Sequence, residues 1–166
     1  MSILRVIVLF IFATSCSVKY SLTGASISPE TKTFQVNYFQ NTAPLIEPGI
    51  ERDFTNKLID LLINQTSLEL VKSNGDLTYE GEIVEYRISP TTATANNTAA
   101  QNRLTIAVNV RFFDKSDSEA DFEKRFSFYY DYAGNIQLVG GQKDIAVDEI
   151  FERITQDIFN ASLAKW

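Results

Sequence analysis

Two stretches in the middle of the chain constrain the fold most. Residues 76–89 and 103–114 each alternate apolar and polar side chains, which is the period of a β-strand with one buried face. The polar segment 90–102 lies between them, is rich in threonine, alanine and asparagine, and is typical of a loop. We therefore expect two long antiparallel strands, joined by a loop at their tip, as the framework of the fold.

The first of these stretches changes its apolar side partway along. An alternating strand places Leu77, Tyr79 and Ile83 on one face, and the next apolar residues, from Val84 onward, on the other. Such a change requires one extra residue in the strand or an end that is buried on both sides. Because glycine within a strand often marks a bulge, we expect the change near Gly81.

Two amphipathic helices and further strands complete the predicted elements. Alternation at 33–39 and at 122–132 predicts the first and the last strand, and a short strand fits 66–72. Apolar residues at three- and four-residue steps predict helices at 50–65 and 144–165. Their apolar stripes are formed by Ile50, Phe54, Leu58, Leu61 and Leu62, and by Val147, Ile150, Phe151, Ile154 and Ile158 with either Ala161 or Ser162.

The order β-α-β-β-β-α predicts an α+β domain with two layers. We expect two helices packed on one face of a four-stranded mixed β-sheet, with the first strand parallel to its neighbour and the later strands antiparallel. The other face of this sheet would be uncovered, and it is either a docking surface or a face turned to water. It would carry Thr105, Asn109, Arg111, Ser127 and Tyr129.

The composition argues against several kinds of function. The chain has 166 residues, and its net charge of −6 disfavours nucleic acid and anionic membrane surfaces as partners. Histidine is absent, which excludes imidazole-based catalysis and histidine metal sites. The single cysteine, Cys16, cannot form a disulfide within the chain. We expect no enzyme activity, no metal and no cofactor.

Two acidic clusters are alternatives to that expectation. Glu80 and Glu82 share a strand face, where paired carboxylates could hydrolyse a glycosidic bond or simply keep the strand solvated. The second cluster lies at 114–121. It could hold calcium, but it lacks the glycine and the glutamate of an EF-hand loop, so we expect a solvated turn. Its acidic residues are Asp114, Asp117, Glu119 and Asp121.

Arg87 and Arg103 are the strongest candidates for a binding site. They flank the predicted loop, and antiparallel pairing of the two strands would bring them close together. Two guanidinium groups at such a place could bind a phosphate or a carboxylate through paired hydrogen bonds. Ordinary ion pairs with Glu82 or Glu85 are the alternative. The same sheet is expected to carry Arg111, Lys124 and Arg125.

The N-terminus has the parts of a lipoprotein signal peptide. Arg5 gives a positive start, residues 6–13 form an apolar run too short to span a bilayer, and small residues precede Cys16. A buried first strand with a free cysteine is the alternative. Two or more acyl chains on the cysteine would anchor the chain stably in a membrane. We interpret the chain as a signal peptide at 1–15, a lipidated tether at 16–32 and a domain at 33–166.

Several short segments carry a family resemblance. They are YSLTGAS at 20–26, DLTYEGEI at 76–83, AAQNRLTI at 99–106, DIFN at 157–160 and the final Trp166. In this order, after a lipobox and with the predicted fold, they resemble the LptE family of lipopolysaccharide-assembly lipoproteins, in the branch found in Bacteroidota. The resemblance runs from Cys16 to Trp166, which is nearly the whole predicted mature chain.

The resemblance implies a non-enzymatic subunit of the lipopolysaccharide translocon. Its partners would be the outer-membrane β-barrel LptD, which it plugs and helps to assemble, and lipopolysaccharide, which it helps to deliver to the outer leaflet. Lipidation of Cys16, followed by Ser17 and not by aspartate, implies anchoring at the periplasmic face of the outer membrane. An accessory interaction lipoprotein of another envelope transporter or secretion pore is the alternative.

The resemblance also implies where lipopolysaccharide would bind. Family members use basic residues near a strand–loop tip, and in this sequence that role falls to Arg87 and Arg103. Arg111 and Tyr129 are further candidates for contact with lipopolysaccharide or with the barrel, because they lie on the predicted uncovered face. We expect that changing Arg87 and Arg103 together to alanine weakens this contact and leaves the fold intact.

Overall fold

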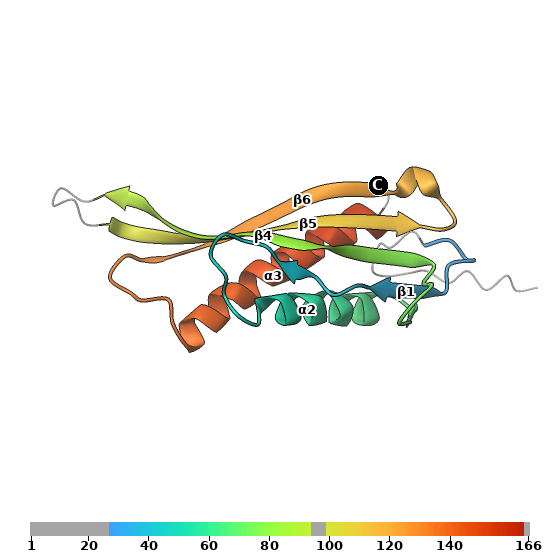
Figure 1. The fold of residues 1–166 in the computed structure, drawn as a ribbon, viewed down its shortest axis with the longest axis horizontal. Coiled ribbons are helices and arrows are strands. Elements are labelled where there is room, and N and C mark those ends of the chain that lie inside the picture. Colours follow the sequence, from blue (N-terminus) through green and yellow to red (C-terminus); the bar gives the residue numbers. More distant parts are fainter. Residues whose placement is uncertain (1–26, 94–98, 165–166) are drawn as a thin grey trace, which may run out of the picture.

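The computed structural model describes residues 27–93 and 99–164, and it shows a mixed β-sheet with two helices packed on one side (Figure 1). The predicted α+β fold with two layers is confirmed. The prediction of four strands is wrong, because the described residues form six, and the order of elements differs accordingly. The elements are β1 (Thr33–Val36), β2 (Gln40–Asn41), α2 (Ile50–Gln65), β3 (Glu69–Leu70), β4 (Leu77–Ala93), β5 (Ala99–Asp114), a 3-10 turn η1 (Ser118–Ala120), β6 (Phe122–Ala133) and α3 (Gly141–Leu163).

The sheet has the order β3-β1-β4-β5-β6, and β2 pairs with β4 on the same side as β1. The pairs of β1 with β3, of β1 with β4 and of β2 with β4 are parallel. The pairs of β4 with β5 and of β5 with β6 are antiparallel. The prediction that the first strand is parallel to its neighbour and that the later strands are antiparallel is therefore confirmed.

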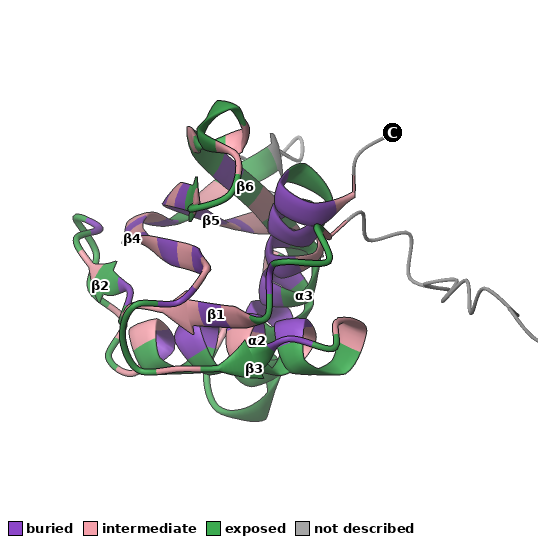
Figure 2. Ribbon diagram, turned by 90° about the vertical axis from the view of Figure 1, so that its right-hand side faces the viewer, coloured by how far each residue is buried: buried purple, intermediate pink, exposed green. Residues whose placement is uncertain are grey.

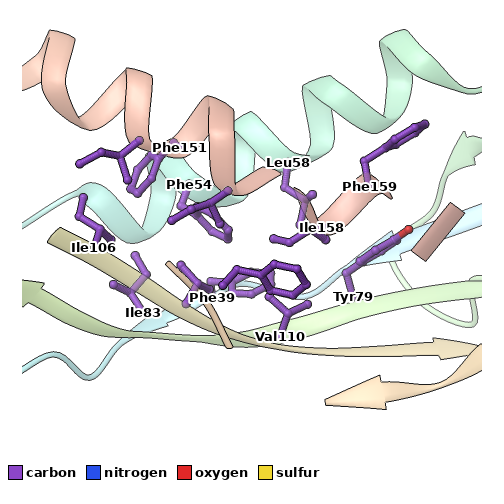
Figure 3. Packing of buried hydrophobic residues seen from close by; sticks show 14 of the residues in the cluster. Phe39, Phe54, Leu58, Tyr79, Ile83, Ile106, Val110, Phe151, Ile158 and Phe159 are labelled. Carbon is purple, nitrogen blue, oxygen red and sulfur yellow. The ribbon is translucent and has the colours of Figure 1, made fainter. Parts of the chain in front are cut away.

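The first predicted strand, 33–39, is shorter in the structure, where β1 ends at Val36, and the two-residue strand β2 begins only after residue 39. The chain leaves the sheet after Val36 and returns at Gln40. Phe39 is fully buried and Tyr38 is 56% exposed. The ring of Phe39 packs edge-on against that of Phe54, with 5.0 Å between the ring centres (Figure 3). Phe54 packs in the same way against Phe151, with 5.1 Å between the ring centres. This aromatic row joins the sheet to α2 and α3.

Gly81 lies beside the buried ring of Phe39 and does not form the expected bulge. A β-carbon at this position would lie 2.0 Å from the carbonyl oxygen of Asn109 and 2.8 Å from the Phe39 ring. Because glycine has no side chain, β4 can lie close to both neighbours. Gly81 therefore allows β4 to approach Asn109 and Phe39 closely, and the pairing of β4 with β5 stays regular there.

The bulge itself lies at Val84, three residues beyond the predicted place. Ile83 pairs with Val108 and Glu85 with Ala107, so one residue of β4 has no partner in β5. The extra residue reverses the alternation and turns Tyr86 toward the helices, where it is buried. Burial, with the nearby charge of Glu47, raises the pKa of Tyr86 to about 12.

The loop predicted at 90–102 is mostly strand. β4 continues to Ala93 and β5 begins at Ala99, so the two strands form a long hairpin that projects beyond both helices (Figure 1). Pro90 is tolerated because this part of β4 pairs only with β5 and its other edge is free of a described partner. The middle of the predicted loop, 94–98, lies outside the described residues.

Both helices have the predicted apolar stripes. α2 begins and ends as expected, and α3 begins three residues earlier than expected. Of the two alternatives at the end of the second stripe, Ser162 is buried and Ala161 is exposed. The hydroxyl groups of Ser162 and Tyr79 are 3.0 Å apart, and burial raises the pKa of Tyr79 well above its ordinary value. Within the described residues, neither helix is long and apolar enough to cross a membrane.

We expect Gly81→Ala to lower the free energy of unfolding by at least about 2 kcal/mol, because overpacking against backbone cannot relax by a side-chain rotation. Urea unfolding monitored by circular dichroism measures the change. Gly141→Ala is the matched control, since a β-carbon there meets nothing within 4 Å. The control should stay within about 0.5 kcal/mol of the parent. Equal effects of the two variants would contradict the close approach at Gly81.

Deletion of Val84 should leave a folded protein. Removal of the unpaired residue leaves Ile83 opposite Val108 and Glu85 opposite Ala107, so no other side chain changes face. Deletion of Thr105 from β5 is the control, because it moves either Leu104 or Ile106 out of the core. Thermal unfolding by circular dichroism should show a cooperative transition for the first deletion only. Loss of the cooperative transition in both deletion variants would contradict a bulge at Val84.

Candidate interaction surface

The face of the sheet that the helices leave open is here called the outer face. It is built from alternate residues of β4, β5 and β6, while the residues between them belong to the core. Figure 2 shows this alternation of buried and less buried residues along the ribbon of β4. The expected face is confirmed, since its five predicted members are half-buried or exposed and alternate with core residues such as Ile106 and Val108. The predicted members are Thr105, Asn109, Arg111, Ser127 and Tyr129.

The first of three ion-pair groups on the outer face is centred on Arg111. Its Nε donates to Glu80 at 3.0 Å, and its Nη1 donates to Glu82 at 3.2 Å. Glu80 also accepts a hydrogen bond of 3.0 Å from the side-chain amide of Asn37. The hydrogen bond to Glu80 is the largest cause that raises the pKa of Arg111, and the charge of Glu82 and the hydrogen bond to it raise this pKa further. With two carboxylates and one guanidinium, this group carries a net charge of −1.

The second group is centred on Glu85, whose side chain is 19% exposed. Glu85 accepts a hydrogen bond of 2.7 Å from Nε of Arg87 and a second from Nη2 of Arg125. Arg125 reaches it from β6 across Ala107, which is fully buried and too small to separate them. Arg87 and Arg125 are 58% and 52% exposed, so this group presents a net charge of +1 to its surroundings.

The third group joins Arg103 to Asp131. Two hydrogen bonds of 2.7 and 2.8 Å run from Nε and Nη2 of Arg103 to the two carboxylate oxygens. The guanidinium carbon lies 3.6 Å above the centre of the Tyr129 ring, a cation–π contact. The hydrogen bonds from Arg103 lower the pKa of Asp131, and those to Asp131 raise the pKa of Arg103. This group is neutral.

The structure places Arg87 and Arg103 side by side, as expected. Arg87 lies opposite Thr105 and Arg103 opposite Ser89, so the two arginines are diagonal neighbours on one face. Each has its own carboxylate, and the ion pair of Arg87 with Glu85 is the one named above as the alternative. Arg111 and Arg125 lie on the same face.

Lys124 does not share the outer face. It lies in the expected sheet, but on the other side of β6, where its ammonium group is 5.1 Å from the ring centre of Phe126. The period of two along β6 decides this, because residues 124 and 125 must point to opposite sides of the sheet.

The two acidic clusters have structural partners. Glu80 and Glu82 share Arg111, which makes them part of an ion-pair group with no free carboxylate pair. In the turn, Asp121 accepts the backbone N–H of Asp114, and Asp117 accepts that of Glu119 at the start of η1. Among the described residues, no group of three or more cysteine, aspartate and glutamate side chains is placed to hold a metal ion.

Sequence reasoning did not identify Asp131 or the importance of Arg125. A usable signal was present, because aromatic residues at 126, 128, 130 and 132 put all odd positions of β6 on the outer face. The pairing of those odd positions with Arg103 and Glu85 needed the register of three strands, which period alone does not give. Cys16, 1–26 and Trp166 lie outside the described residues.

Solved structures with low sequence identity share this fold. The hypothetical protein CT253 from Chlamydia trachomatis is 12% identical, with a TM-score of 0.55 over 81% of this chain and 99% of that one. The uncharacterized lipoprotein B from Nitrosomonas europaea is 13% identical, with a TM-score of 0.53 over 86% of each chain. No curated protein sequence matches the chain. The fold thus defines a class of two-layer α+β domains with one open sheet face.

The family is shown by the sequence itself. The sequence pattern of LptE, described as lipopolysaccharide-assembly, matches residues 31–162, which is most of the chain and nearly all of the described fold. The chain belongs to the LptE family of lipoproteins involved in lipopolysaccharide assembly, as the resemblance implied.

We expect the titration of Asp131 to report the ion pair with Arg103. Its pKa is lowered from 3.8 in the folded state, so the pair contributes stability above the unfolded pKa, and this contribution is lost as the pH falls through the lower folded pKa. Arg103→Gln should raise the pKa of Asp131 toward 3.8. Carboxyl NMR titration of both proteins measures the shift. An unchanged pKa in the variant would contradict the assignment of its cause.

Proposed function

We propose that this protein is a non-enzymatic, lipid-anchored subunit of the lipopolysaccharide translocon, which plugs an LptD-type outer-membrane β-barrel, assists its assembly and aids delivery of lipopolysaccharide to the outer leaflet. The family match supports a role in lipopolysaccharide assembly. The observation that carries the finer proposal is the outer face, a broad sheet surface that is uncovered, polar and held by three ion-pair groups.

An ion-paired sheet face suits the lumen of a barrel. The interior of such barrels is polar, so its partner must offer hydrogen bonds and charges, not an apolar surface. Because each arginine of the outer face is already oriented by a carboxylate, little side-chain freedom is lost when a partner binds. We propose Arg111 and Tyr129 as barrel contacts, since they lie on this face on β5 and β6.

The ion-pair group centred on Glu85, which has a net charge of +1, supports contact with an anionic glycolipid. Arg87 and Arg125 share the single carboxylate of Glu85 and remain more than half exposed, which leaves hydrogen-bond donors for a phosphate. Arg103 lies diagonally across from Arg87 and is the second proposed contact. Arg87 and Arg103 lie on the part of the hairpin that leads to its tip, and Arg125 lies nearer the start of β6.

The described chain begins at Ile27 near the start of β1, which is at the far end from the hairpin tip (Figure 1). We propose that Cys16 is lipidated after removal of 1–15, that 16–32 is a tether and that 33–166 is the domain. The tip would then point away from the anchored end, at the periplasmic face of the outer membrane.

Arg87→Ala combined with Arg103→Ala should reduce recovery of the barrel, or of lipopolysaccharide, with the protein from detergent-solubilised outer membranes. A reduction of about tenfold is expected, since one lost charged hydrogen bond is worth about 1.4 kcal/mol. Arg52→Ala is the matched control, because Arg52 is an exposed arginine on α2 with a carboxylate partner, Asp53. All variants should keep the circular dichroism of the parent.

Two results would contradict the proposal at different levels. Normal recovery of both partners with the double variant would remove Arg87 and Arg103 from the contact. Depletion of the protein with normal surface lipopolysaccharide would contradict the role in the translocon and would favour service to another envelope transporter or secretion pore.

A further inference from the structure

A groove of about 480 Å³ lies beside the bulge, at the edge of β4 that faces away from β5. β2 pairs with β4 only as far as Ile83, and beyond it this edge has no strand partner among the described residues. The segment between β2 and α2 adds Pro44 and Leu45 to the lining of the groove. The volume is within the usual range for a site that binds a small ligand.

The side chains that β4 adds to the groove are largely apolar. Val84, the residue without a partner in β5, lines the groove together with Ile88 and the ring of Tyr86. A bulge often directs a side chain into a binding site, and Val84 has this position here. Ile88 is 44% exposed and Leu45 is 53% exposed, so both are accessible to a ligand.

The charged residues of the lining have a net positive charge. They are Arg87, Arg125 and Glu85, and the two arginines share the single carboxylate. The bonds to Glu85 use the Nε of Arg87 and the Nη2 of Arg125, so each guanidinium keeps further N–H groups that can donate to a ligand. An apolar groove with two exposed guanidinium groups is complementary to an apolar chain that is attached to an anionic group.

The groove is formed without a ligand, because hydrogen bonds hold the segment between β2 and α2 in place. The N–H of Thr42 donates to the carbonyl of Ile83 at 2.9 Å. The side-chain amide of Asn41 donates to the carbonyl of Glu47 at 3.4 Å, and the ammonium group of Lys143 donates to the carboxylate of Glu47 at 2.5 Å. A site that is already ordered loses little conformational freedom when a ligand binds.

We propose that this groove holds one acyl chain of a phosphorylated glycolipid, whose phosphate lies at Arg87 and Arg125. The inference rests on the proposed function for the presence of such a lipid, and it adds the part of the lipid that the protein recognises. Each methylene group that leaves water for the groove should improve binding about fourfold.

Two other occupants fit the groove poorly. The wall of a barrel lumen is polar, so it does not supply an apolar chain. The hydroxyl groups of a sugar would lose water without gaining hydrogen bonds from side chains such as Pro44, Leu45, Val84 and Ile88.

A cross-link tests the occupant in the membrane. In cells that make the full-length chain, a photoreactive benzoyl-phenylalanine replaces either Leu45 or Ile46. Ile46 is the matched control, because it is 65% exposed on the same segment and does not line the groove. Only the position of Leu45 should give a glycolipid adduct, and mass spectrometry of the digested adduct should place the new bond on an acyl chain. No adduct at Leu45, or an adduct with a sugar, a phospholipid or a protein, would overturn the proposal.

Polar substitutions test the apolar contact. Leu45→Asn combined with Ile88→Asn should lower the recovery of glycolipid with the protein from detergent-solubilised outer membranes about tenfold. Recovery of the barrel should not change. Ile46→Asn combined with Val139→Asn is the matched control, since both residues are exposed and lie outside the groove. All four positions are exposed, so both variants should keep the unfolding transition of the parent.

The outcomes separate this inference from the proposed function. Recovery of glycolipid at the level of the parent by the variant of Leu45 and Ile88 would overturn the groove as an acyl-chain site and leave the proposed function standing. Loss of the barrel with that variant would also overturn it, because the groove would then hold a protein segment. A parent protein that recovers neither barrel nor glycolipid would contradict the proposed function, and the acyl-chain site with it.

Discussion

One extra residue in β4 determines which side chains meet the helices and which form the outer face. Up to Ile83, the odd-numbered residues of β4 point toward the core, and after Val84 the even-numbered ones do. Without this change, either Tyr86 would leave the core or the acidic half of the strand would enter it. The bulge therefore allows one strand to serve the core along its whole covered length, and it puts Glu85 and Arg87 on the outer face.

The ion-pair groups of the outer face depend on the bulge at Val84, which exchanges the sides to which odd and even residues of β4 point. Glu85 collects two guanidinium groups only because it lies on the same side as Arg125, with the small side chain of Ala107 between them. The net charge therefore differs between the three groups along the hairpin. It is negative at Arg111, positive at Glu85 and zero at Arg103. A single sheet face thus combines an oriented polar surface with one place suited to an anionic group.

Predictions from the sequence succeeded where one periodic pattern decides the structure. The bounds of α2 and the stripe of α3 followed from three- and four-residue steps, and the long strands followed from alternation. They failed where two elements compete for one space. Phe39 is buried in place of Tyr38 because its ring fits between Gly81 and Phe54, a contact between residues far apart in the chain. Phe39 accordingly lies between β1 and β2, outside both strands.

The sequence by itself determined the fold class, the two apolar helical stripes, the alternation of β5 and β6 and the membership of the LptE family. These properties are local or are spread along the chain as a pattern. Only the tertiary structure decided the position of the bulge and the partners of the arginines on the outer face. The physical reason is register: a shift of one residue between strands exchanges the two faces of the sheet, and packing between distant side chains selects the shift.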